Sequence, residues 1–195
     1  MLRTALFLPL FFLALLSAPF SARAAMEIEV VGGAANKIAI ALLSFGAAPS
    51  QPAPAIAQIV GDDLKRSGQF SFLDTSGIPP AADITRVNAG AWRSQGAEAV
   101  VVGQVVAVSG GRYEVKFRLL DAVKQTQLAG FSYTIAAGQW RTTAHQIADI
   151  IYEKLTGTRG AFSSRIAYVQ KQGKRYELKV ADADGQNPRT VVRSG

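Results

Sequence analysis

The sequence predicts an α/β fold, a mixed β-sheet with helices packed on it, followed by the first strands of a β-propeller. In residues 25–158, strand-like runs alternate with amphipathic segments and end in three consecutive strand-like runs, an order typical of a mixed sheet covered by helices. In residues 159–195, short strand-like runs and turn residues follow at regular spacing, as in a propeller blade. A blade takes about 40–45 residues, so we expect this chain to be the front part of a longer protein.

Residues 1–24 have the layout of a secretory signal peptide. Arg3 supplies the positive charge, residues 5–16 form an apolar run, and Ala22 and Ala24 frame an Ala-x-Ala cleavage site. The apolar run is shorter than the ~20 residues that a membrane-spanning helix needs, although an uncleaved anchor is the alternative. We expect cleavage after Ala24, export to the periplasm, and no other segment that spans a membrane.

The first half of the mature chain begins with two strand-like runs. Residues 26–30 alternate apolar and acidic side chains, and Gly32-Gly33 follows as a flexible joint. The run 37–45 is apolar without interruption from Ile38 to Leu43, which is typical of a strand covered on both faces. The next expected elements are a Pro-rich loop at 46–54, a helix through Ile56, Ile59, Val60 and Leu64 that Gly68 ends, a strand at 69–73 and a short helix at 88–95 around Trp92.

Three strands and a long helix complete this first domain. The Val-rich run 97–108 and the alternating run 113–119 flank the hairpin signal Gly110-Gly111, and residues 126–136 return as a third strand. Residues 139–155 predict an amphipathic helix that Gly157 ends, with an apolar stripe of Trp140, Ala144, Ile147, Ile151 and Leu155. Beyond residue 159, strands are expected at 164–169, 176–181 and from residue 190, with turns at 172–174 and 184–185.

Composition and charge exclude several classes of function. The 195 residues are 49% hydrophobic, which is too much for a disordered chain, and include no cysteine, which excludes disulfides, zinc–thiolate sites and a cysteine nucleophile. The net charge of +7 is unevenly distributed. Residues 25–158 hold eleven basic and eleven acidic residues, whereas residues 159–195 hold eight basic and three acidic ones. The main body is therefore neutral and lacks the basic, aromatic-lined stripe expected of a nucleic-acid-binding domain.

No pattern in the sequence predicts catalysis, a cofactor or a metal. The only histidine, His145, precedes Asp149 by one helical turn, a pair more typical of surface hydrogen bonding than of a catalytic site. Asp62 and Asp63 are neighbours on a helix, so they point about 100° apart and one should face solvent. Asp182-Ala-Asp-Gly185 begins like a calcium loop, but no distal carboxylate follows, and a tight hairpin turn explains it better.

Several segments resemble the TolB family of the Tol–Pal system. They are the junction at 152–169, which is the most specific, and the runs Asp63-Leu-Lys-Arg-Ser-Gly-Gln-Phe70, Gly96-Ala-Glu-Ala-Val-Val-Val-Gly-Gln104 and 176–187. The resemblance implies a periplasmic, non-enzymatic adaptor with an N-terminal α/β domain at 25–158 and a six-bladed propeller that begins after a linker in 159–195. It also implies that the propeller binds the lipoprotein Pal and that the system supports outer-membrane integrity and cell division. Colicins, which exploit this pathway in the family, are further partners that the resemblance implies.

The resemblance further implies that residues 25–36 are an extended segment that binds the inner-membrane protein TolA. Its contact residues would be Met26, Glu27, Ile28, Glu29, Val30 and Val31, with Met26, Ile28 and Val30 facing the partner. A strand beside a flexible joint can add to the edge of a partner's sheet through main-chain hydrogen bonds, although an ordinary edge strand is the alternative. Glu27 and Glu29 make the segment more acidic than expected, and Ser44 stands where many relatives have proline. No Pal-binding residue is assigned, because most of that surface would lie beyond Gly195.

Two other classes of protein remain open. The chain could be the front end of a propeller-bearing exported peptidase whose catalytic domain is missing, and a nucleophile elbow beyond Gly195 would distinguish it. A periplasmic solute-binding domain is the other alternative, although the chain is small for a two-lobed binder and shows no repeat of its halves.

Overall fold

The structure is a computed structural model, and it describes residues 37–47 and 53–194. The signal peptide with Ala22 and Ala24, the strand expected at 26–30 and the binding residues Met26 to Val31 all lie outside the described residues. None of the described helices is long and apolar enough to cross a membrane.

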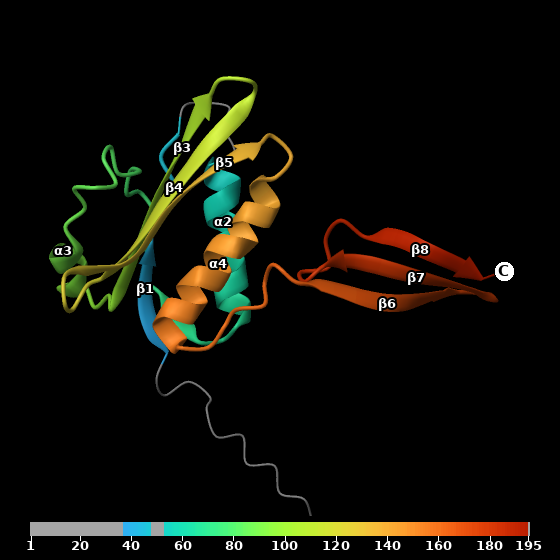
Figure 1. Cartoon of the computed structure of the whole chain (residues 1–195). Coiled ribbons are helices and arrows are strands. Elements are labelled where there is room, and N and C mark those ends of the chain that lie inside the picture. Colours follow the sequence, from blue (N-terminus) through green and yellow to red (C-terminus); the bar gives the residue numbers. More distant parts are fainter. Residues whose placement is uncertain (1–36, 48–52, 195) are drawn as a thin grey trace, which may run out of the picture. The chain divides into compact units, whose positions relative to one another are not determined.

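A mixed five-stranded sheet in the order β2-β1-β3-β4-β5 forms the centre of the α/β domain (Figure 1). In its parallel part, β1 pairs with β2 on one side and with β3 on the other. The rest is the expected antiparallel meander, in which β3 pairs with β4 and β4 with β5. The strands are β1 (Ile38–Leu42), β2 (Phe70–Phe72), β3 (Ala99–Val108), β4 (Arg112–Asp121) and β5 (Thr126–Ala136).

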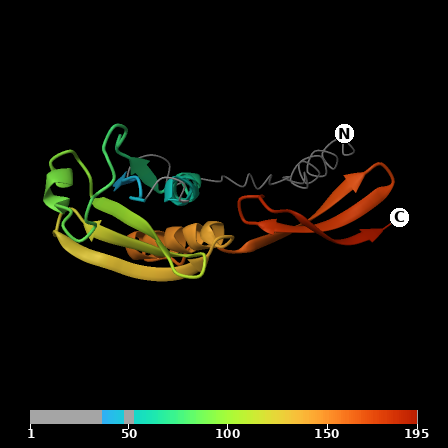
Figure 2. The same cartoon turned by 90° about the horizontal axis from the view of Figure 1, so that it is seen from above.

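Helices cover both faces of this sheet, which explains why β1 and the first half of β3, residues 99–103, are apolar throughout. Helices α2 (Ala53–Arg66) and α4 (Trp140–Thr156) lie side by side on one face, and their apolar stripes join the larger core cluster (Figures 1 and 2). The short helix α3 (Ala89–Arg93) covers the other face, where Trp92 belongs to a second core cluster with Ala41 of β1 and with Val100 and Val102 of β3. The mixed α/β fold and the order of its described elements are therefore confirmed.

Gly103 in β3 is required by the packing of Phe45 on the sheet. A Cβ atom added at Gly103 would lie 2.4 Å from the Phe45 ring, well inside van der Waals contact. Phe45 is itself buried at the end of the run that starts with β1. The aromatic ring thus fills the space that a side chain at position 103 would occupy.

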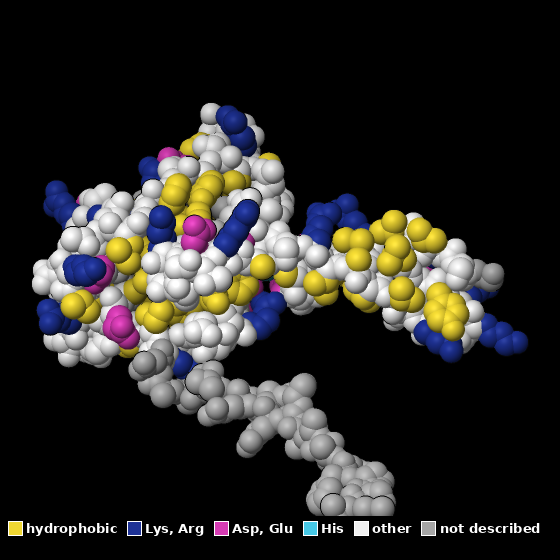
Figure 3. All heavy atoms as spheres, turned by 60° about the horizontal axis from the view of Figure 1, so that its bottom comes forward, with side chains coloured by type: hydrophobic (Ala, Val, Ile, Leu, Met, Phe, Trp, Pro, Cys, Tyr) yellow, Lys and Arg dark blue, Asp and Glu magenta, His cyan; other side chains and the backbone are white. Residues whose placement is uncertain are grey.

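The last described residues form a separate three-stranded antiparallel sheet, in the order β6-β7-β8. Its strands are β6 (Arg165–Gln172), β7 (Arg175–Asp182) and β8 (Arg189–Ser194). Cross-strand neighbours Val169, Leu178 and Val192 share one face, and all three are exposed, Val169 by 63%. Figure 3 shows hydrophobic side chains gathered over this sheet. The sheet thus carries an uncovered apolar face in the part of the chain that the structure describes.

Candidate functional site

Buried Asp63 and His145 link α2 to α4. Asp63 is 1% exposed and His145 2% exposed, and Asp63 Oδ2 lies 2.6 Å from His145 Nδ1. The other carboxylate oxygen of Asp63 accepts a hydrogen bond of 2.6 Å from Arg66, one turn further along α2. Because a buried carboxylate is costly unless its oxygens have partners, these two contacts explain how Asp63 is tolerated inside the helix pair.

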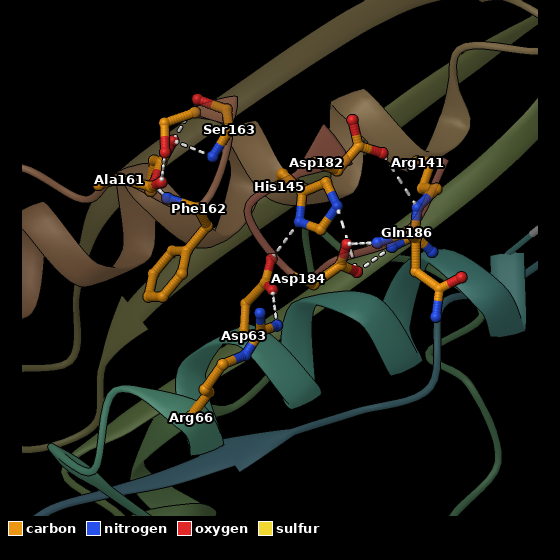
Figure 4. A network of polar contacts seen from close by, with 12 residues as sticks. Asp63, Arg66, Arg141, His145, Ala161, Phe162, Ser163, Asp182, Asp184 and Gln186 are labelled. Atoms are coloured by element: carbon orange, nitrogen blue, oxygen red, sulfur yellow. Dashed lines mark hydrogen bonds and ion pairs between the residues drawn. The ribbon is translucent and has the colours of Figure 1, made fainter. Parts of the chain in front are cut away.

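Arg141 connects the first turn of α4 to the loop between β7 and β8. Its guanidinium pairs with Asp184, and its Nε lies 3.5 Å from Asp182 Oδ2 (Figure 4). The loop begins as the tight turn expected from the sequence: Gly185 adopts φ +83° and donates a hydrogen bond of 2.8 Å to the Asp182 carbonyl. The turn thereby presents two carboxylates to one helix. We call Asp63, Arg141, His145, Asp182 and Asp184 the junction cluster.

Asp149, also on α4, holds the segment that leads to β6. Its carboxylate accepts hydrogen bonds from the backbone N–H groups of Phe162 at 2.6 Å and Ser163 at 3.1 Å. Gly160 passes so close to the helix that an added Cβ would lie 2.6 Å from the Asp149 Cα. The Phe162 ring then packs edge-on against Tyr152, with ring centroids 5.6 Å apart. Residues 160–163 are thus fixed to α4 by backbone hydrogen bonds, close packing and an aromatic contact.

The interpretation of His145 and Asp149 as a surface pair was wrong. His145 is buried and bonds Asp63, 82 positions away, while Asp149 bonds the segment at 160–163. Trp140 also departs from prediction, because it is 37% exposed although it was assigned to the apolar stripe of α4. The expectation for the adjacent acids is confirmed, since Asp62 is exposed and Asp63 buried.

Local sequence patterns could not show that Asp63 and His145 contact each other, although they did indicate that both residues lie on buried helix faces. Asp63 lies three residues after buried Val60, and His145 three residues before buried Ala148. Each polar residue therefore stands at helical spacing from an apolar one, on the face that its helix buries. Two polar residues on buried helix faces are a reason to look for a mutual contact.

The junction cluster also contains the described residues best placed to hold a metal ion. Donor atoms of His145, Asp182 and Asp184 all lie within 4.8 Å of one another. His145 Nε2 is buried, has no hydrogen-bond partner among the described residues and lies 3.8 Å from Asp184 Oδ2. Figure 4 shows the imidazole between Asp63 on one side and Asp184 on the other.

The family model and the similar curated sequences name one family. The model of the TolB amino-terminal domain matches residues 26–128. The Tol-Pal system protein TolB of Thiobacillus denitrificans is 69% identical over 179 residues, which cover 92% of this chain and 42% of that protein. The protein of the same name from Methylobacillus flagellatus is 49% identical over 178 residues, covering 89% of this chain and 41% of that protein.

A solved structure extends the likeness to three dimensions. The crystal structure of TolB from Acinetobacter baumannii matches with a TM-score of 0.71 and 34% identity, over 82% of this chain and 39% of that one. This chain therefore spans about two fifths of the length of the relatives that it matches.

Proposed function

Because the chain belongs to the TolB amino-terminal domain family, we propose that it acts as a non-enzymatic adaptor of the Tol–Pal system in the periplasm. In this proposal it links a TolA-type inner-membrane protein to the lipoprotein Pal, supports outer-membrane integrity and invagination during division, and is open to colicins that use the pathway. The observation that carries the proposal is the 69% identity to a Tol-Pal system protein TolB across 92% of the chain.

We propose a domain boundary after residue 158. Residues 1–24 are the signal peptide of this proposal, 25–158 the α/β domain, and 159–195 the linker and the incomplete first blade of a propeller. The exposed apolar face of β6-β7-β8 supports the last assignment, since an apolar sheet face of this kind requires cover. Neighbouring blades of a propeller supply such cover, and Pal would bind mainly to those blades.

Side chains of α4 hold the segments that connect the α/β domain to the three-stranded sheet. The junction cluster and Asp149 tie α4 to the turn at 182–185 and to residues 160–163. An adaptor that joins two partners through two parts needs such a connection to keep their spacing. This geometry supports an adaptor role without assigning any chemistry to the cluster.

For TolA binding we propose the leading segment, with Met26, Glu27, Ile28, Glu29, Val30 and Val31 as contact residues. Its alternating sequence suits strand addition to the edge of a partner's sheet, in which main-chain hydrogen bonds supply affinity and alternate side chains supply specificity. Gly32-Gly33 separates the segment from β1, so it can pair with a partner while β1 stays in the sheet.

The test is calorimetric titration of the secreted chain with the soluble domain of a TolA-type protein. A Met26→Asp, Ile28→Asp, Val30→Asp variant should lose binding, because three carboxylates would replace the apolar contact face. The matched control, Glu153→Gln, changes an exposed carboxylate on α4 outside the proposed contact residues and should leave the affinity unchanged. Unchanged affinity in the triple variant would refute the assignment of this segment.

A further inference from the structure

A buried imidazole nitrogen without a partner points into the carboxylates of the junction cluster. His145 Nε2 has no hydrogen-bond partner among the described residues, although the residue is only 2% exposed. The nearest acceptor, Asp184 Oδ2, lies 3.8 Å away, too far for a hydrogen bond. A buried polar atom without a hydrogen-bond partner requires an explanation. A metal ion bound between His145 Nε2 and Asp184 Oδ2 would provide one.

We propose that His145, Asp182 and Asp184 bind a divalent transition-metal ion of the zinc class. Zinc binds imidazole nitrogen at about 2.0–2.1 Å and carboxylate oxygen at about 2.0–2.2 Å, so two of its ligand atoms lie at most about 4.3 Å apart. The 3.8 Å between His145 Nε2 and Asp184 Oδ2 meets this limit. The third donor, on Asp182, lies within 4.8 Å of the others, and binding the same ion would draw it closer to them.

Asp63 supplies the outer-shell contact that histidine ligands of metals usually have. Its carboxylate lies 2.6 Å from His145 Nδ1, so in the tautomer with the proton on Nδ1 it accepts that hydrogen bond, and Nε2, on the side of Asp184, is left to bind a metal. A neutral imidazole in this tautomer is the form that binds a metal. Arg66 in turn holds the other oxygen of Asp63, which fixes the orientation of the pair.

Arg141 is the competing cation at this site. Its guanidinium pairs with Asp184 and approaches Asp182, so a metal must share these carboxylates with it or displace it. Each carboxylate has capacity beyond that pairing: Asp182 Oδ1 receives no hydrogen bond from the described residues, and Asp184 Oδ1 accepts one, of 3.1 Å from the Gln186 backbone. With a neutral imidazole, Asp63, Asp182 and Asp184 carry three negative charges, and among the described residues they form ion pairs with two arginines, Arg66 and Arg141, which leaves one negative charge for a metal to offset.

The test is calorimetric titration of the full, metal-stripped chain with zinc chloride, repeated with cobalt chloride to record the visible spectrum of the bound ion. We expect one equivalent of zinc, and a weakening of at least tenfold for His145→Gln and for Asp184→Asn. Asp63→Asn should weaken binding by about 10–100-fold, as outer-shell substitutions do. Arg141→Gln should tighten binding, because it removes the competing cation.

The matched control is Glu153→Gln, which removes an exposed carboxylate on α4 outside the cluster and should leave affinity unchanged. Asp184 lies in a turn and is less buried than His145, so the Asp184→Asn variant should still fold and remains informative if His145→Gln does not. Failure of the parent chain to bind zinc, equal affinity in Asp184→Asn, or weaker binding in Arg141→Gln would each overturn the proposal.

Discussion

Replacing Asp63 by alanine should lower the free energy of unfolding by about 3 kcal/mol, because the change removes the acceptor of a buried imidazole N–H. An orphaned buried donor costs about 1–3 kcal/mol. The second lost contact, with Arg66, adds at most about 1 kcal/mol, since the Arg66 side chain is 45% exposed. Near the midpoint, a loss of this size lowers the Tm by about 6–12 °C for a protein of this length.

Urea unfolding followed by circular dichroism measures this effect. The midpoint should fall while the slope stays constant, as expected for a change in stability rather than in compactness. Asp62→Ala, at the exposed neighbouring position, is the matched control and should stay within about 0.5 kcal/mol of the parent. Asp63→Leu combined with His145→Leu should cost less than Asp63→Ala, since no buried donor is left without a partner. Equal midpoints for Asp63→Ala and Asp62→Ala would refute the reasoning.

Three further outcomes test other parts of the structure. Gly103→Ala should destabilise the protein by about 1–3 kcal/mol, because its Cβ would meet the Phe45 ring at 2.4 Å. Adding Phe45→Leu, which replaces the ring by a smaller side chain, should recover part of this loss in thermal unfolding. Asp149→Ala should cost about 1–2 kcal/mol and speed amide exchange at Phe162, which loses its acceptor; unchanged exchange there would count against the anchoring role. A peptide of residues 159–194 alone should show little amide protection, because its strands lack neighbours to bury against, and strong protection would contradict this.

Two controls make the first two of these outcomes specific. Gly138→Ala places a Cβ where nothing lies within 4 Å, so it should leave the Tm unchanged while Gly103→Ala lowers it. Glu153→Ala removes an exposed carboxylate from α4 and should leave amide exchange at Phe162 unaltered. A similar loss in either control would point to a general effect of the substitution.

The order of elements could be predicted from the sequence because each helix and strand has its own local pattern of apolar residues. The continuous apolar run of β1 indicated cover on both faces, and Gly110-Gly111 and Gly157 take the positive φ values that a hairpin turn and a helix end require. The position of β1 between β2 and β3 could not be derived in this way, since parallel neighbours carry no turn signal between them.

The junction was missed for a related physical reason. Helical spacing relates His145 to residues three or four positions away, and Asp149 was the only carboxylate there. The actual partner, Asp63, comes from another helix, and its distance in space depends on how α2 and α4 pack. Asp182 and Asp184 were rightly interpreted as a turn, but their approach to α4 follows from the course of the chain after residue 160.

The position of β1 between β2 and β3 has a mechanical consequence for any partner attached upstream of it. A pull on the chain before Lys37 reaches Ile38 first, and β1 is hydrogen-bonded along both edges, to β2 and to β3. Tension along the strand would load these two short rows of bonds in shear, so that the bonds of both rows must break together, whereas an edge strand can be peeled off one bond at a time. A tether joined to this strand therefore transmits force into the middle of the domain.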